Sequence, residues 1–453
     1  MRIVLSDSIK GSLRRRVSVI ICALLGTWIV NFPYEGQLLY ALAKNNGFVN
    51  AGMLDISLIM LILGLLTGGL VLRSIQAARV SLLAAIPVCV LGTMVFFFPP
   101  GVLWAIALSL CAATAGFCIT ACGYFIKKDV ALEYRFRTAA EILICISVLK
   151  VIINAISLSV SIQAGMAISL LLLAVSWYLT MSTLVIKPQK EIPKEHNKKA
   201  IAKAMLVVIL FIMVVAIDFG IMIEVINPRY SDFGWLSSWY WLIPYAGAAF
   251  VMRRVKKSTD RSNILFVSVG MIGFGYLLFV MLDYSITSYL IVTTVMMGAW
   301  GIYDVFWWST LAEMFEMSKN PAMIFGVGYS SVMLGVLIGK TITTGSHGIP
   351  ESNLYVIQMA VICSTLVILP MLHRFLSALI KKTTEEIRQL PSKADALTER
   401  EREIVALMLK GRTARLMAAE LYLSENTVKT HIKNIYSKLD IKSKAELFNY
   451  ILD

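Results

Sequence analysis

The residues best suited to bind another molecule lie near the C-terminal end, where residues 424–439 predict one amphipathic helix. One face of this helix is polar and partly basic, and it carries Asn426, Lys429, Thr430, Lys433 and Ser437. The other face is apolar and carries Val428, Ile432, Ile435 and Leu439. Ser424 stands at the N-cap position. Lysine and hydroxyl donors on an exposed helix suit base edges and phosphates in the major groove of DNA.

Short helices before and after this segment complete a small domain. Thr398 with Glu401 forms a capping box, which predicts a helix that begins there. A second short helix is expected over about 413–421, and Ser443 with Glu446 forms another capping box that begins a fourth helix. Four helices on short connections, with a basic third helix, predict a helix-turn-helix domain.

Three stretches of this domain resemble the LuxR-type helix-turn-helix of bacterial transcription regulators: LTEREREIVALMLKG, LSENTVKTHIKNIYSKL and KSKAEL. The resemblance implies a four-helix DNA-binding domain over residues 396–453, with double-stranded promoter or operator DNA as its partner. It implies that the side chains facing the bases are Lys429, Thr430 and Lys433. It implies a second group of contacts with the DNA backbone, made by Ser424, Thr427, Asn434, Lys438 and Lys444. It also implies homodimerisation through the fourth helix.

The rest of the chain has the composition of a membrane protein. Hydrophobic residues make up 58% of the sequence and charged residues 15%, and the mean hydropathy is +0.75. Twelve apolar runs long enough to span a bilayer precede residue 377: about 17–36, 50–72, 80–98, 101–126, 138–160, 163–186, 204–226, 235–252, 263–282, 288–312, 322–344 and 354–376. We therefore expect an all-α, polytopic membrane protein.

The distribution of basic residues predicts the orientation of these spans. Alternate loops, counted from the N-terminal segment, contain twenty-three Lys and Arg residues, whereas the other loops contain only Lys44 and Arg229. Basic loops remain in the cytoplasm. Both termini are therefore expected on the cytoplasmic side of the inner membrane of a bacterium, and most of the net charge of +14 reflects topology.

The spans divide into two sets of six around a basic linker. The expected parts are a cytoplasmic segment 1–16, a first half 17–186, the linker 187–203, a second half 204–376 and a cytoplasmic connector 377–395. Two six-helix halves resemble the architecture of the major facilitator superfamily of transporters. The basic loop of that family is degraded here around Arg73, which weakens the expectation of transport more than that of the fold.

Ionisable residues inside predicted spans indicate a candidate ligand pocket. Trp300, Asp304 and Trp307 recur on one helix face, so that a carboxylate lies between two indoles. This arrangement suits a cationic or aromatic small molecule, and Lys150 and Lys340 are further candidates for the pocket. In the alternative, Asp304 pairs with one of these lysines to hold helices together, and the indoles face lipid. A tryptophan-rich stretch is expected in an aromatic belt: Trp235, Trp239, Tyr240 and Trp241.

The sequence contains no recognisable motif for catalysis, metal binding or cofactor binding. Its seven cysteines all lie in predicted spans without a CxxC pair, and its four histidines are scattered. We therefore expect no catalytic residue, no metal site and no cofactor. The favoured hypothesis is a membrane-bound, one-component transcription regulator that senses a small molecule. The alternatives are a transporter with an appended regulatory DNA-binding domain, and a scaffold that anchors DNA at the membrane.

Overall fold

The computed structural model describes residues 7–34, 36–46, 51–183, 198–255, 261–318, 320–344, 397–409, 414, 417–418, 421, 423–439, 441 and 447. The chain divides into two compact units, Met1–His373 and Arg374–Asp453. Every regular element within the described residues is a helix, which confirms the all-α class.

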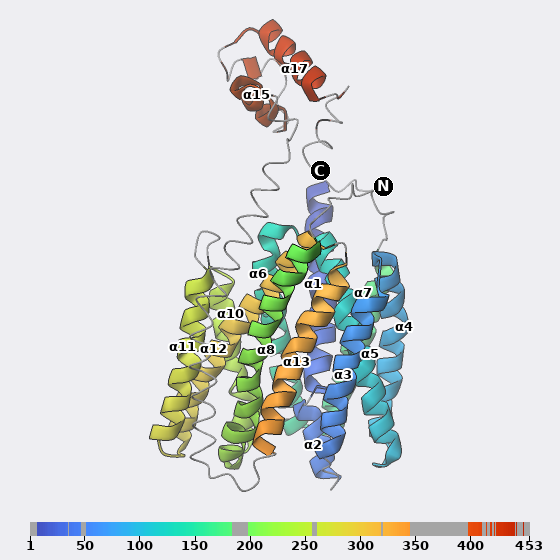
Figure 1. Ribbon diagram of the computed structural model, residues 1–453. Coiled ribbons are helices and arrows are strands. Elements are labelled where there is room, and N and C mark those ends of the chain that lie inside the picture. The colour runs from blue at the N-terminus through green and yellow to red at the C-terminus, as the bar shows by residue number, and fades with distance from the viewer. Residues whose placement is uncertain are drawn as a thin grey trace. The chain divides into compact units, whose positions relative to one another are not determined.

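The first unit, called the membrane unit below, is a bundle of long helices (Figure 1). Its first seven helices are α1 (Asp7–Asn31), α2 (Gln37–Asn45), α3 (Ala51–Val71), α4 (Ile75–Met94), α5 (Val102–Asp129), α6 (Arg135–Ser159) and α7 (Ile162–Ser182). The next six are α8 (Lys198–Arg229), α9 (Trp235–Trp239), α10 (Leu242–Met252), α11 (Arg261–Met281), α12 (Ile286–Glu313) and α13 (Pro321–Thr344). Four short 3-10 turns lie at Val95–Phe97, Leu132–Tyr134, Ser231–Phe233 and Met314–Met317.

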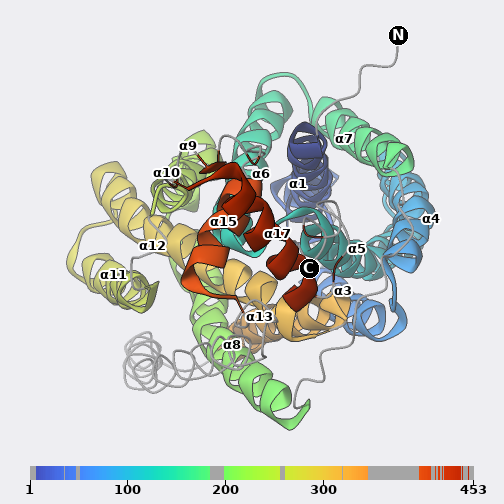
Figure 2. The same cartoon turned by 90° about the horizontal axis from the view of Figure 1, so that it is seen from above.

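The helices of the membrane unit form two halves that lie side by side. Seen along the helix axes, α1 and α3 to α7 gather on one side, and α8 to α13 on the other (Figure 2). The halves meet where α13 packs on α3 and α5, and where α6 packs on α10 and α12. Nine helices among the described residues are long and apolar enough to cross a membrane. The expected span 354–376 lies outside the described residues.

Local chemistry explains where the helices differ from the expected spans. The span expected over 235–252 is divided into α9 and α10. Pro244 has no N–H to donate to the carbonyl of Tyr240, which instead accepts from Ile243 at 2.9 Å. α4 begins five residues before the expected 80, because the Ser74 hydroxyl accepts a hydrogen bond from the backbone N–H of Ala77. The short helix α2 was not expected.

Small residues allow the closest helix packing inside the second half. A Cβ added to Gly220 on α8 would lie 2.3 Å from the carbonyl oxygen of Val336 on α13. One added to Gly339 on α13 would lie 2.2 Å from the carbonyl oxygen of Ile217. Each glycine therefore permits a backbone-to-backbone approach that any side chain would prevent, which is the usual basis of tight helix packing in membranes.

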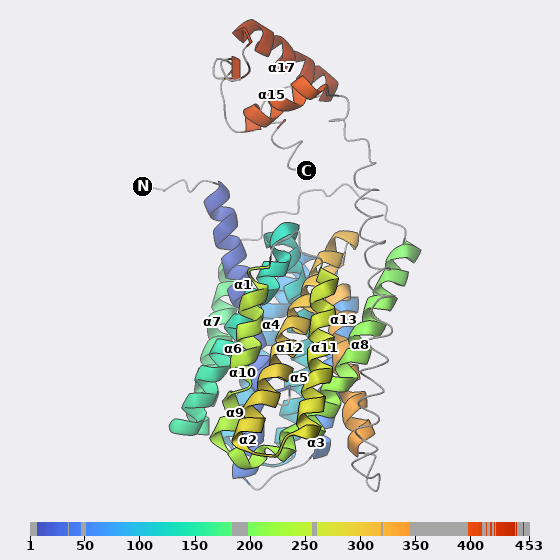
Figure 3. The same ribbon diagram turned by 90° about the vertical axis from the view of Figure 1, so that its left-hand side faces the viewer.

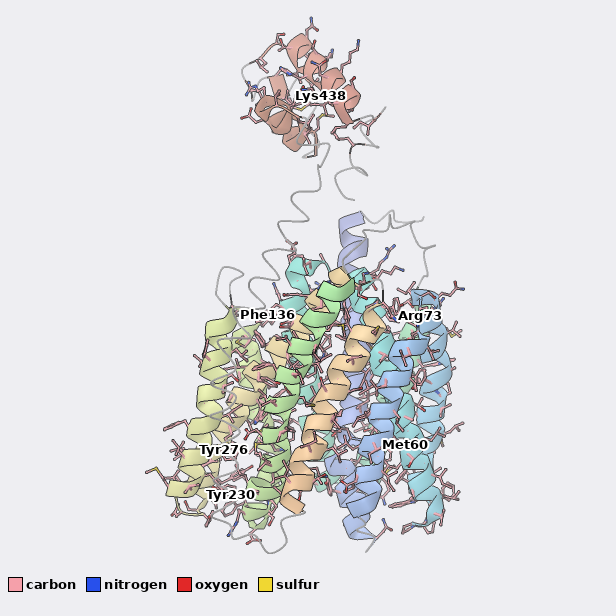
Figure 4. All side chains as sticks on the ribbon, viewed as in Figure 1. Met60, Arg73, Phe136, Tyr230, Tyr276 and Lys438 are labelled. Atoms are coloured by element: carbon pink, nitrogen blue, oxygen red, sulfur yellow. The ribbon has the colours of Figure 1, made fainter. Side chains whose placement is uncertain are left out.

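The two ends of the membrane unit differ in what they contain. The short helices α2 and α9 lie together at the end far from the start of α1 (Figure 3). Tyr230 lies toward this same end, whereas Arg73 and Phe136 lie at the other (Figure 4). The first is called the Tyr230 end below, and the second the Phe136 end.

The second unit contains α15 (Glu399–Leu409) and α17 (Glu425–Leu439). Its core gathers apolar residues from both helices and from the segments around them, namely Leu397, Ile404, Val405, Met408, Met417, Ala418, Val428, Ile435, Leu439 and Leu447. Three residues of the expected apolar face of α17 are buried, and Ile432 packs against this core. The expected capping box at Ser443 lies outside the described residues.

Replacing Gly220 by Ala should destabilise the membrane unit, because the new methyl group would overlap the α13 backbone. We expect a loss of about 1–3 kcal/mol, as for an overpacked core, seen as a lower melting temperature of the detergent-solubilised protein. Gly247→Ala is the matched control, since nothing lies within 4 Å of an added Cβ there. Equal melting temperatures for the two variants would contradict the packing argument.

Candidate nucleic-acid interface and membrane cavity

Helix α17 begins at a well-made N-cap. The hydroxyl of Ser424 accepts a hydrogen bond from the backbone N–H of Thr427 at 3.0 Å, and its oxygen lies 2.7 Å from the Thr427 hydroxyl. Val428, Ile435 and Leu439 anchor the opposite side of the helix in the core. The local sequence therefore fixes both where the helix begins and which face it presents to solvent.

The residues expected to contact DNA from α17 and its N-cap all carry exposed side chains. These are Ser424, Thr427, Lys429, Thr430, Lys433, Asn434 and Lys438. Lys444 lies outside the described residues, as does the helix expected to dimerise. The polar face is thus accessible, which is what a helix that enters the major groove requires.

The lysines of this face differ in their partners. The ammonium of Lys429 lies 2.8 Å from the Glu425 carboxylate one turn earlier, whereas among the described residues no ion pair is recorded for Lys433. The Thr430 hydroxyl donates to the backbone oxygen of Asn426 at 3.0 Å. Sequence reasoning missed Glu425, although the i to i+4 spacing of Glu and Lys is a known signal for such a pair.

Glu401 links the capping box to the recognition helix. Its carboxylate accepts from the backbone N–H of Thr398 at 2.7 Å and from the ammonium of Lys438 at 2.8 Å. The Glu401 N–H is in turn directed at the Thr398 hydroxyl at 3.3 Å, so the expected capping box is present. The hydrogen bond from Lys438, supported by those from Thr398, lowers the pKa of Glu401 below its ordinary value of 4.5. Lys438 therefore has a structural partner in addition to the backbone contact expected of it.

A cavity of about 1320 Å³ lies within the membrane unit, and both halves contribute to its walls. At the Tyr230 end it is lined by Tyr34, Leu38, Tyr230 and Gly234. Deeper in the bundle it is lined by aromatic side chains, which include Tyr245, Trp300, Trp307, Phe325 and Tyr329. Its size is that of a site for a small molecule.

Asp304 lies among these aromatic residues and has neutral partners. One carboxylate oxygen accepts from the Tyr245 hydroxyl at 2.6 Å, and the other accepts from the Trp307 indole N–H at 2.8 Å. Trp300 and Trp307 are buried, at 3% and 5% exposure, so neither has the lipid-facing position of the alternative. The pairing of Asp304 with a lysine, which belongs to the same alternative, is absent from the described residues.

Lys150 also lines the cavity, and it is 8% exposed. Its ammonium donates to the backbone oxygen of Val30 at 3.0 Å and lies 4.6 Å from the centre of the Trp241 ring. No carboxylate among the described residues pairs with it. Trp241, which was expected in an aromatic belt, contributes to the wall of the cavity.

Lys340 does not join this group. Its ammonium lies 3.4 Å from a carboxylate oxygen of Asp55 and 3.7 Å from one of Glu224, and it is not part of the cavity wall. These pairs join α13 to α3 and α8. Lys150, Trp300, Asp304 and Trp307 therefore line the same cavity. Lys340 lies outside its wall, in an ion cluster that includes Glu224 of the wall.

Polar bonds join the two halves at the Phe136 end, where the cavity does not reach. The Arg135 guanidinium donates to the carbonyl of Ala312 at 2.9 Å, and the Arg253 guanidinium lies 3.0 Å from Glu141. The Asn320 amide donates to the carbonyl of Gly69 at 3.0 Å. Each bond connects a helix of one half with an element of the other, so this end of the unit is closed.

Comparison with known proteins identifies the C-terminal unit. Residues 395–451 match the sequence profile of the family described as bacterial regulatory proteins, luxR family. The spore germination protein GerE of Bacillus subtilis is 42% identical over 50 residues, which are 11% of this chain and 68% of GerE. The transcriptional regulatory protein LiaR of the same species is 43% identical over 56 residues, 12% of this chain and 26% of LiaR. A putative HTH-type regulator of Aeromonas salmonicida is 46% identical over 59 residues, 13% of this chain and 30% of that protein.

The membrane unit resembles solved transporter structures. The human organic anion transporter MFSD10 superposes with a TM-score of 0.59 at 11% identity, covering 81% of this chain and 100% of that one. FucP, a Major Facilitator Superfamily transporter in the outward conformation, gives a TM-score of 0.56 at 13% identity, over 79% of this chain and 98% of FucP. At such low identity the likeness shows the fold alone.

The chain thus joins a DNA-binding helix-turn-helix unit to a membrane unit with the major facilitator fold. It matches about a quarter to a third of the length of LiaR and of the Aeromonas regulator. Through its C-terminal unit, it belongs to the luxR family of bacterial regulatory proteins.

Glu401 makes the stability of the C-terminal unit dependent on pH. Because its pKa is lowered in the folded state, its contribution is present above its ordinary pKa of 4.5 and is lost as the pH falls through the folded value. We expect Glu401→Gln to lower the free energy of unfolding at pH 7 by about 1 kcal/mol. The free energy of unfolding of this variant should also fall less steeply than that of the wild type as the pH is lowered. Thermal melting of residues 374–453, followed by circular dichroism between about pH 3 and 7, measures both. The exposed Glu403, paired only with Arg400 among the described residues, provides the control variant Glu403→Gln, and an identical effect there would contradict the assignment.

Proposed function

We propose that this protein is a membrane-bound, one-component transcription regulator. A small molecule binds in the cavity of the membrane unit, and the conformation of that unit controls sequence-specific DNA binding by the C-terminal unit. The observation that carries this proposal is the union, in one chain, of a luxR-family DNA-binding domain with a bundle that encloses a cavity of about 1320 Å³. Its regulator relatives and transporter-like neighbours also favour a protein that is not an enzyme.

The distribution of basic residues supports an orientation for this function. With the basic loops in the cytoplasm, both termini and the DNA-binding unit lie on the cytoplasmic side of the cell membrane of a bacterium, where DNA is accessible. The Phe136 end, which carries Arg73, Arg137 and Arg253, then faces the cytoplasm. The Tyr230 end of the cavity then faces outward.

Charge balance supports action as a homodimer on DNA. From residue 397 onward the sequence contains ten Lys and Arg residues and eight Asp and Glu residues, so one domain attracts phosphates only weakly. Two domains on one operator combine their contacts. Within each domain, Lys429, Thr430 and Lys433 face the bases, and the serine, threonine, asparagine and lysine contacts around them hold the backbone.

A second candidate function is transport, with the DNA-binding unit acting as feedback. The cavity and the major facilitator fold favour it. Membrane vesicles that contain a chain truncated at about residue 380 would accumulate substrate if the protein transports, and would not if it only senses.

Replacing both Lys429 and Lys433 by Ala should abolish regulation without affecting membrane insertion. Good base contacts contribute about 1–3 kcal/mol each, so we expect the occupancy of operator DNA to fall on the order of tenfold or more. Genome-wide DNA capture with the full-length protein, together with transcript profiling, measures this loss. Glu403→Ala, an exposed change on α15, serves as the control. Unchanged occupancy in the double variant would exclude the assigned recognition face.

A further inference from the structure

We propose that the cavity takes a small organic ligand bearing a carboxylate, and that Lys150 binds that carboxylate. This inference deepens the proposed function, because it names the chemical class of the ligand. It rests on the polar groups of the cavity wall and on which of them have hydrogen-bonding positions that the described contacts leave unused.

The first step concerns the charge of Lys150. An ammonium group has three donors, and the described contacts use one of them, at the carbonyl of Val30. The Trp241 ring offers a favourable face but no acceptor. A buried ammonium without a carboxylate partner is costly inside a membrane protein. A ligand carboxylate would supply both the missing charge and the missing acceptors.

The second step compares Lys150 with the two acidic residues of the cavity wall, Asp304 and Glu224. These carboxylates are the groups that would bind a cationic ligand. Asp304 already accepts one hydrogen bond on each carboxylate oxygen. Glu224 lies 3.7 Å from the ammonium of Lys340. Both oxygens of Asp304 therefore already have donors, and Glu224 lies near a cation, whereas Lys150 has two donors that the described contacts do not use. An anionic ligand therefore gains more from the site than a cationic one.

The third step concerns the surroundings of Lys150. A polar stripe at helical spacing runs along α6 and lines the cavity, formed by Ser147, Lys150, Asn154 and Ser157. The Asn154 amide donates to the carbonyl of Ser238 at 3.2 Å, which leaves its second N–H for a ligand. The aromatic walls around Trp300 and Tyr245 suit the apolar body of the molecule. The geometry matches a carboxylate attached to a ring or a short apolar chain.

Titration of the purified full-length protein with benzoate tests this class. Benzylamine and benzyl alcohol carry the same ring with a positive charge or no charge, and sodium chloride keeps the ionic strength constant. Tryptophan fluorescence reports binding, because the Lys150 ammonium rests against the Trp241 ring. We expect a saturable change with benzoate, and binding weaker by about tenfold or more for the amine and the alcohol.

Two variants assign the effect to one lysine. Lys150→Met should weaken benzoate binding by about tenfold or more, since it removes the charge and keeps an unbranched side chain. Lys127→Met, which changes a lysine outside the cavity wall whose ammonium donates to the backbone oxygen of Ser318, should retain benzoate binding. If the Lys150 variant does not fold, the comparison of the three probes on the wild-type protein still shows whether the cavity prefers a carboxylate.

The proposal is overturned if benzylamine binds as tightly as benzoate, if benzoate gives no saturable change, or if Lys150→Met binds benzoate as well as the wild type does. None of these measurements involves DNA. Benzoate binding without any effect of Lys429 and Lys433 on transcription would therefore contradict the regulator proposal alone.

Discussion

The membrane unit depends first on how it compensates the charged side chains buried between its helices. Such groups are tolerated in a bilayer only where other polar groups replace the missing water. Arg135 finds backbone carbonyls, among them that of Ala312 on the opposite half. Lys340 finds the carboxylates of Asp55 and Glu224. Because each solution takes partners from different helices, the need to satisfy these charges also fixes how the helices pack.

Lys150 meets this need only in part, because the Val30 carbonyl uses one of its three donors. Lys150 lies in the wall of the cavity, so a bound ligand can supply the acceptors and the negative charge that the protein does not provide. A fully paired lysine at this position would make the empty bundle more stable but would leave little for a ligand to gain. Incomplete compensation at a binding site therefore converts ligand binding into a change in the stability of one conformation.

The bonds at the Phe136 end set the energy that such a change must supply. At the Phe136 end, bonds from Arg135, Arg253 and Asn320 hold the halves together. A typical hydrogen bond contributes about 0.5–1.5 kcal/mol net, and one to a charged group about 1.5–3. A few such bonds amount to several kcal/mol, which is comparable to the binding energy of a micromolar ligand, about 8 kcal/mol. Opening this end therefore lies within reach of a ligand that binds the opened conformation more tightly by that amount.

Sequence reasoning predicted the elements whose signals are local, and it missed the partners that only tertiary packing creates. The capping box at Thr398, the apolar face of α17 and most of the spans follow from short-range pattern and composition. The bond between Glu401 and Lys438 joins residues 37 positions apart, and no periodicity indicates it. For the same reason, the sequence placed Asp304 beside the Trp307 indole, which does contact it, but could not supply Tyr245 as its second partner or separate Lys340 from Lys150.

The modest charge of the DNA-binding unit is consistent with control by the membrane unit. A domain that bound operators tightly as a monomer would remain bound whatever the membrane unit did. Here Glu425 partly neutralises Lys429, and Lys438 is shared with Glu401, so phosphate attraction is limited. A coupling free energy of about 1–3 kcal/mol, typical of allosteric proteins, changes affinity by roughly 5- to 150-fold. Such a change alters occupancy most when the uncoupled domain binds near its threshold, and weak intrinsic binding therefore makes the unit easier to regulate.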